Sequence, residues 1–248
     1  MKITSDFVDL LTSDGGHIRT FLATPHSVGR YPSIIFYSDI FQLTGPMLRS
    51  CARLAGYGFV VAAPEIYRRI EPPGLVIPFD DAGRARGLED AGNTPVAHFD
   101  ADCRTVLDYL YEHPAVASGQ MGAAGFCIGG HLAFRAALQP DVRATVCFYG
   151  TGIHNGVLGE DPDAGSLQRA AEIRGELLLV WGALDPHIPE EGRTRIDEAL
   201  QEAGSKFSQR LYQAEHAFMR DEGSRYDPEA TDEAFSEMIR LYARVFAR

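Results

Sequence analysis

The stretch 122-GAAGFCIGG-130 places Cys127 between Gly125 and Gly129, where an apolar run gives way to a helical pattern. Residues 121–126 are expected to form a strand, and residues 129–138 continue as a helix. A G-x-C-x-G turn between a strand and a helix is the nucleophile-elbow pattern with cysteine in place of serine. Glycines flank it because side chains there would collide across the turn. The helix N-terminus favours the thiolate, so the stretch predicts a nucleophile, although a free cysteine is more often a buried packing residue.

Outward from this turn, apolar runs alternate with helical patterns along the chain. The expected strands are 33–37, 59–64, 121–126, 144–150, 176–182 and 208–213. Most of these runs are continuously apolar, as in parallel strands that helices cover on both faces. One helix is expected from Thr94-Pro95 to about His113, and another starts at Asp227-Pro228 with an apolar stripe that continues to Val245. The fold class is therefore α/β, with a mostly parallel central sheet.

Two segments do not follow this alternation of strands and helices. The first 25 residues predict an antiparallel hairpin that turns at 14–16. Residues 65–94 carry paired prolines, dense charge and little periodicity, and are expected to form a long irregular loop. Since they follow a strand's carboxyl end, we interpret them as a lid or substrate wall, the alternative being a solvated excursion. The whole chain, 1–248, is predicted to be a single domain.

The composition and net charge of the chain limit the kinds of partner that the protein is expected to bind. The net charge of −11 argues against nucleic acid and anionic membranes, although a few arginines can still bind a small anion. No signal peptide is apparent, and no apolar run approaches the roughly 18 residues of a membrane span. The four cysteines form no C-x-x-C pair, and Cys127 with His131 lacks further ligands for a metal site. We expect a reduced, cytoplasmic monomer or homodimer without metal or cofactor.

A nucleophile needs a base and an orienting acid, which in this fold follow it along the chain on loops after later strands. Asp185 follows the expected strand 176–182, and His216 follows the strand 208–213. Their order and placement predict a Cys-His-Asp triad. His187 lies too near Asp185 in sequence to form the relay easily, and His131 is one helical turn beyond Cys127, where a structural role is expected.

Two backbone amides are expected to form an oxyanion hole. One belongs to Ile128, directly after the nucleophile, and the other to Ile40, in the loop after the first long strand. The three other cysteines are interpreted as packing residues: Cys51, Cys103 and Cys147.

With these residues assembled, the chain resembles the dienelactone hydrolase family of α/β-hydrolases over nearly its whole length. The resemblance is carried by GFCIGG at 125–130, GALDPHIP at 182–189 and EHAFMR at 215–220. It implies an α/β-hydrolase fold and the catalytic roles already given to the triad. It also implies that Arg220 holds a substrate carboxylate, and Tyr149 matches the family as well.

The chain departs from the family at two places. The best-known members carry a glutamate after the first core strand that helps to ionise the thiol, whereas this chain has Asp39, one methylene shorter. The family's second arginine lies in the lid, where Arg84 and Arg86 are candidates, and Arg68 and Arg69 are expected to be solvated.

The sequence therefore predicts a carboxylic ester hydrolase that opens an ester or lactone, similar to a carboxymethylenebutenolidase, through a thioester intermediate. One alternative keeps the triad but acts as a carboxylesterase or thioesterase on an unrelated neutral substrate. Another is a thiol-sensing protein without catalysis, in which Cys127 reacts but no ester is turned over.

Overall fold

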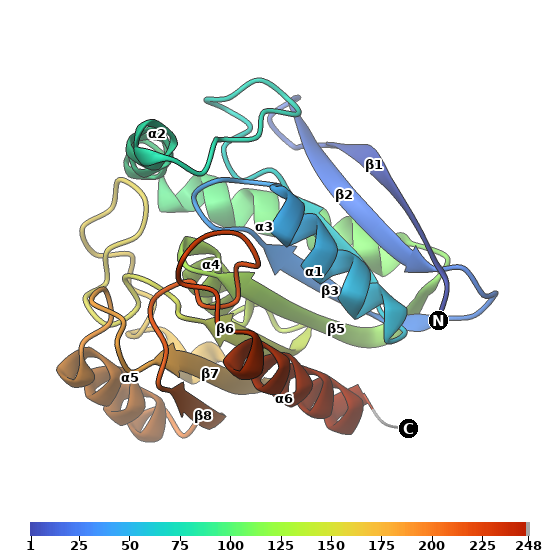
Figure 1. The fold of residues 1–248 in the computed structure, drawn as a ribbon. Coiled ribbons are helices and arrows are strands. Elements are labelled where there is room, and N and C mark those ends of the chain that lie inside the picture. The colour runs from blue at the N-terminus through green and yellow to red at the C-terminus, as the bar shows by residue number, and fades with distance from the viewer. Residues whose placement is uncertain (247–248) are drawn as a thin grey trace.

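The computed structural model describes residues 1–246, in which eight strands form one sheet flanked by six α-helices (Figure 1). The strands are β1 (Ile3–Leu11), β2 (His17–Pro25), β3 (Tyr31–Tyr37), β4 (Val60–Pro64), β5 (Val116–Phe126), β6 (Val142–Phe148), β7 (Glu176–Gly182) and β8 (Lys206–Tyr212). The helices are α1 (Gly45–Gly56), α2 (Asp81–Gly92), α3 (Val96–Glu112), α4 (Ile128–Ala136), α5 (Glu190–Glu202) and α6 (Pro228–Phe246), with a 3-10 turn at Ala170–Glu172.

The sheet has the order β1-β2-β4-β3-β5-β6-β7-β8. The hairpin β1–β2 is antiparallel, and β2 also runs antiparallel to β4. All pairings from β4 through to β8 are parallel. The predicted mostly parallel sheet with an N-terminal antiparallel hairpin is thus confirmed.

Two helical layers cover the sheet. Helices α1 and α6 pack on one face, and α3 and α4 pack together on the other (Figure 1). Strands β4 and β7 are buried along their whole length, which explains their continuously apolar sequences. On the α6 face, the Tyr242 hydroxyl donates to the Ala123 carbonyl at 2.6 Å, joining α6 to β5. No helix within residues 1–246 is both long and apolar enough to cross a membrane.

The connection order places the carboxyl ends of β3 and β5 at a topological switch point. The chain leaves β3 for β4 on one side and then crosses to β5 on the other side of β3. Loops diverge at such a point and leave a crevice, where α/β folds bind ligands. Asp39 follows β3 and Cys127 follows β5, so the topology brings both predicted site residues to this crevice.

Two expectations about local structure were wrong. Strand β5 begins at Val116 instead of 121, because the extended chain continues through Gly119, at φ +69°, with a register shift just after Met121. The segment 65–94 is not irregular throughout, since α2 occupies its second half.

Helix α2 has no apolar stripe because it packs through glycines. The Asp80 side chain caps it by accepting from the Gly83 amide at 2.7 Å. A Cβ on Gly83 would lie 1.9 Å from the Pro78 carbonyl oxygen, and one on Gly87 would lie 2.4 Å from that of Ile40. The helix therefore sits directly on the loop after β3.

The start of the 65–94 segment is fixed by ion pairs. Arg69 Nη1 lies 2.7 Å from the carboxylate of Asp102 on α3, and Arg68 Nη2 lies 2.8 Å from Asp14 in the hairpin turn. The expectation that both arginines are solvated was wrong: the side chain of Arg68 is only 6% exposed, and that of Arg69 is 22% exposed.

Candidate active site

Cys127 lies at the tight turn between β5 and α4. Its backbone has φ 57° and ψ −122°, a conformation rarely adopted by residues other than glycine. A Cβ on Gly125 would meet the Gly129 carbonyl oxygen at 1.9 Å, and one on Gly129 would meet the Ser38 carbonyl oxygen at 2.3 Å. The first glycine lets the chain turn back on itself, and the second lets α4 approach the end of β3.

Backbone strain is concentrated around this turn. Four residues other than glycine have positive φ among residues 1–246, and all lie in loops at the carboxyl ends of strands: Gln42, Cys127, Tyr149 and Ala217. Residues held in such conformations often cluster at functional sites, because the surrounding structure must hold them there.

The four cysteines divide into two kinds. Cys127 is partly exposed, whereas the other three are buried. Burial raises the pKa of the Cys103 thiol to about 12 and raises the pKa values of Cys51 and Cys147 further. These three are packing residues, as predicted, and stay protonated.

His216 and Asp185 form a buried pair. His216 Nδ1 lies 2.6 Å from Asp185 Oδ2, and Asp185 Oδ1 accepts from the His187 amide at 2.8 Å. Burial lowers the pKa of His216, but the Cys127 thiolate and the Asp185 carboxylate outweigh it and raise that pKa to about 10. The Cys127 thiol is therefore near enough to His216 to affect its pKa, while Asp185 holds Nδ1 of the same ring.

The rival histidines have other surroundings. His131 is fully buried, with Nδ1 3.1 Å from the Thr151 carbonyl oxygen and Nε2 2.8 Å from Ser166 Oγ. Burial lowers the pKa of His131 to about 3, so this ring is neutral. The ring of His187 packs edge-on against His216, with 4.8 Å between centroids.

Asp39 and Arg220 form a second buried pair beside the triad. Arg220 Nη1 donates to Asp39 Oδ2 at 2.7 Å, and Asp39 Oδ1 accepts from the Phe41 amide at 2.9 Å. Burial raises the pKa of Asp39 above its ordinary value even though Arg220 opposes this. The Arg220 guanidinium also lies over the ring of Phe79, at 4.2 Å from its centroid.

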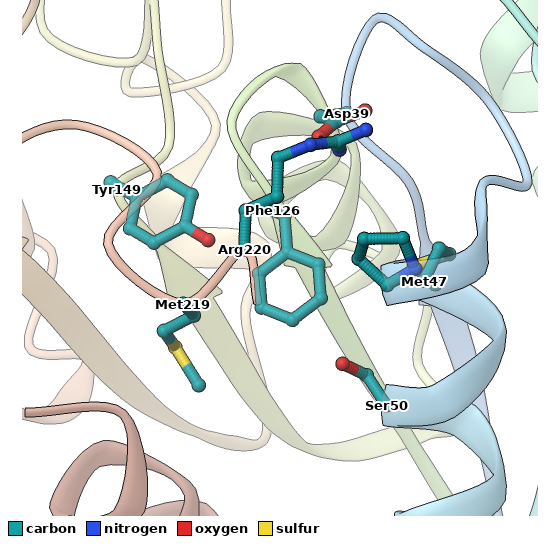
Figure 2. Close-up of a pocket in the computed structure, with 8 residues that line it drawn as sticks. Asp39, Met47, Ser50, Phe126, Tyr149, Met219 and Arg220 are labelled. Atoms are coloured by element: carbon teal, nitrogen blue, oxygen red, sulfur yellow. The ribbon is translucent and has the colours of Figure 1, made fainter. Parts of the chain in front are cut away.

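Arg220 retains unused hydrogen-bonding capacity. Its side chain is 5% exposed, yet Nε and Nη2 have no hydrogen-bond partner within the described part of the chain. Figure 2 shows the guanidinium against Asp39 at a small cavity that Phe126, Tyr149 and Met219 also line. Buried donors without partners are rare, which makes this guanidinium a ready site for an anionic oxygen.

The other predicted binding residues occupy different places. Tyr149 is 2% exposed and packs edge-on against His216, at 5.1 Å between centroids, so it forms a wall of the site. Arg86 Nη2 donates to Glu71 at 2.6 Å and is not brought to the cavity. Arg84 is exposed on α2. Burial is the main cause that lowers the pKa of His187, and the positive charge of Arg84 contributes a smaller part.

The two predicted oxyanion amides belong to segments that follow the neighbouring strands β5 and β3. Ile128 begins α4, where an amide has no partner within the helix. Within residues 1–246, no hydrogen bond engages the amide of Ile40, although its neighbour Phe41 donates to Asp39. The close approach of Gly129 to Ser38 brings these two segments together.

The sequence did not single out some of the residues that lie at the site. Phe41 and Phe79 flank Arg220, and Thr151 lies 4.0 Å from the Cys127 sulfur. Thr151 could have been found, since it follows Tyr149-Gly150 directly after a strand end. Nothing in the sequence indicated Phe79, because only the folded segment 65–94 brings its ring next to Arg220.

A nucleophile-elbow turn on a doubly covered parallel sheet, with a histidine–carboxylate pair after later strands, defines the class of α/β-hydrolases. Within that class, residues 18–246 match the model of the Dienelactone hydrolase family, and the chain belongs to this family. The prediction of an ester or lactone hydrolase is confirmed at that level.

Similar proteins and a similar solved structure carry names that agree with this family. The chain is 35% identical over 98% of its length to a Saccharomyces cerevisiae protein named "Putative carboxymethylenebutenolidase", of which the match covers 93%. It is 28% identical over 93% of its length to the carboxymethylenebutenolidase of Pseudomonas sp. (strain P51), of which 92% is covered. A Klebsiella pneumoniae structure described as a "Putative Dienelactone Hydrolase" superimposes with a TM-score of 0.85 at 24% identity, over 98% of this chain and all of that one.

Proposed function

We propose that this protein hydrolyses an ester or lactone through a thioester intermediate formed on Cys127. The observation that carries the proposal is the pairing of His216 with Asp185 at 2.6 Å, beside a partly exposed thiol on a strained turn. Because the pKa of His216 is raised to about 10, the imidazole is protonated at neutral pH, and we propose that it pairs with a Cys127 thiolate as the attacking group.

The first half-reaction forms the thioester. The Cys127 thiolate attacks the carbonyl carbon, and the electron pair of the C=O bond moves to oxygen. When the tetrahedral intermediate collapses, the C–O bond to the leaving group breaks, and protonated His216 donates its proton to that oxygen. Asp185 orients the ring and stabilises its charged form.

The second half-reaction releases the acid. Neutral His216 takes a proton from water, whose oxygen attacks the thioester carbon. Collapse of this intermediate breaks the C–S bond and restores the thiolate beside the imidazolium. The amides of Ile128 and Ile40 are proposed to donate to the carbonyl oxygen in both tetrahedral intermediates.

Arg220 is proposed to bind a carboxylate on the substrate. Its Nε and Nη2 are buried without partners, and they can donate to one carboxylate while Nη1 stays with Asp39. The burial that raises the pKa of Asp39 makes its carboxylate more basic, and we propose that this residue helps to ionise the thiol. Tyr149 is proposed to form the adjoining wall, and Arg84 and Arg86 are proposed to act from α2 at the rim of the site.

The Asp39–Arg220 pair also favours a second candidate substrate. Asp39 neutralises the guanidinium charge, so a neutral ester or thioester can enter without an unpaired charge beside it. Comparing kcat/KM for matched esters with and without a terminal carboxylate separates the two. A preference for the carboxylated ester supports the first candidate, and a preference for the neutral ester supports the second.

The catalytic proposal is tested by turnover of small activated esters. Cys127→Ala is expected to abolish turnover, and Cys127→Ser to lose most of it, because a site suited to a thiolate does not readily deprotonate a hydroxyl. Cys103→Ala, at a buried cysteine, is the matched control and should retain activity if it folds. Equal turnover by wild type and Cys127→Ala would overturn the proposal, and labelling of Cys127 by iodoacetamide without ester turnover would identify a thiol-sensing protein.

A further inference from the structure

Thr151 contacts Cys127 through both its backbone and its side chain. The Thr151 amide donates to the Cys127 carbonyl at 3.2 Å, and its hydroxyl oxygen lies 4.0 Å from the sulfur. The sulfur is the only hydrogen-bond partner of this hydroxyl within residues 1–246. The hydroxyl proton is therefore free to point at the sulfur, and a thiolate would be the stronger acceptor.

A buried polar cluster holds Thr151 in place. Because a carbonyl oxygen only accepts, His131 Nδ1 carries the proton and donates to the Thr151 carbonyl at 3.1 Å. Nε2 of the same ring then accepts from the Ser166 hydroxyl at 2.8 Å. The neutral state of His131, which its lowered pKa maintains, keeps this arrangement at every ordinary pH.

Helix α4 anchors the far side of the same cluster. Arg135, one turn after His131, donates to Ser166 Oγ at 3.0 Å and to the Ala164 carbonyl at 2.7 Å. Its other nitrogens bind Asp100 on α3. Helix α4, which begins after Cys127, thus also binds the loop that carries Thr151. The position of the Thr151 hydroxyl relative to the thiol is therefore fixed.

We propose that Thr151 is a positioning residue for the nucleophile: its hydroxyl donates to the Cys127 thiolate and directs the sulfur toward His216, and the His131–Ser166–Arg135 cluster fixes it there. This inference rests on the proposed role of Cys127. It adds that the hydroxyl group of Thr151, and not only the shape of its side chain, stabilises the thiolate.

The test compares Thr151→Val, which keeps the shape, with Thr151→Ser, which keeps the hydroxyl. The rate of iodoacetamide alkylation is measured against pH, with the labelled peptide identified by mass. The three buried cysteines should react slowly. Thr151→Val is expected to shift the midpoint of the profile upward by about one pH unit and to slow alkylation about tenfold below that midpoint. Thr151→Ser is expected to keep the wild-type profile.

Controls separate this proposal from others. Thr145→Val removes a buried hydroxyl in the middle of β6 and should leave the profile unchanged. Equal profiles for wild type and Thr151→Val, or equal shifts in the Val and Ser variants, would overturn the role of the hydroxyl. Because alkylation needs no ester turnover, this result is independent of the Cys127→Ala test, which alone decides whether the thiol is the nucleophile. If Thr151→Val lost its circular dichroism signal, the pair Thr151→Ala and Thr151→Ser would make the same comparison.

Discussion

The turn after β5 and the segment 65–94, which we interpret from its sequence as a lid, both border the candidate site, yet they are held in place by different means. The turn includes a close contact between residues only four apart, Gly125 against Gly129, in addition to its contact with Ser38. The lid is held by partners far away in sequence, including Asp14 and Asp102, and by the contact of Gly87 with Ile40. Local contacts leave a readable motif in the sequence, whereas distant contacts leave almost none.

The largest expected effect is at the turn. Gly125→Ala would place a Cβ 1.9 Å from the Gly129 carbonyl oxygen, so the turn must open and Cys127 must move. We expect the melting temperature to fall by about 5–10 °C and ester turnover to fall at least about 100-fold. Gly92→Ala, at the end of α2 with open space around it, is the control and should change neither. Wild-type turnover by Gly125→Ala would show that the turn does not need its glycine.

The second effect concerns Arg220, where the two regions meet. Its guanidinium binds Asp39, in the loop beside the turn, and lies over Phe79 of the lid. Arg220→Met should lower kcat/KM for carboxylated esters about 30- to 100-fold, the worth of a charge-assisted hydrogen-bond pair. Neutral esters should be affected far less.

Steady-state kinetics on the matched ester pair measures this difference. Arg53→Met, which removes an exposed guanidinium of α1, is the control and should treat both substrates as wild type does. An equal loss on both substrates would mean that Arg220 acts through Asp39 or through the fold and does not bind the substrate carboxylate.

The third effect is in the lid. Gly87→Ala should push α2 away from the loop that carries Ile40, because the new Cβ would lie 2.4 Å from the Ile40 carbonyl oxygen. Since α2 is outside the sheet, we expect the melting temperature to change by less than about 2 °C, while kcat falls about tenfold as the Ile40 amide is displaced. A loss of stability as large as that of Gly125→Ala would mean that lid and turn form one cooperative unit.

The difference between local and distant contacts explains which features of the fold and the site could be predicted from the sequence. The buried strands and the order of Cys127, Asp185 and His216 follow from apolar runs and from loops at strand ends, both of which are local patterns. Helix α2 could not be predicted, because it packs through Gly83 and Gly87 and lacks an apolar stripe. Side-chain partners of the arginines were equally hidden: sequence alone does not tell that Arg68 finds Asp102.

The smallest expected effect is a pH-dependent change in stability within the lid. Asp90 is 5% exposed, and its Oδ2 has no partner within the described residues. Burial, together with the neighbouring Glu71 carboxylate, raises the pKa of Asp90 to about 6. Glu71 itself is held ionised by Arg86, at 2.6 Å.

The sign of the effect follows from proton binding. With its pKa raised from about 3.9 in the unfolded chain, Asp90 binds more protons in the folded protein between these two values, so its contribution to stability falls as pH rises from about 4 to 6 and stays unfavourable above. Asp90→Asn, which cannot ionise, should raise the melting temperature by about 2–4 °C at pH 7.5 and by nothing at pH 4. Thermal melts at both pH values measure this, with the exposed neighbour Glu89→Gln as control. An equal gain at both pH values would show that the amide acts through packing and that ionisation of the lid carboxyl does not limit stability.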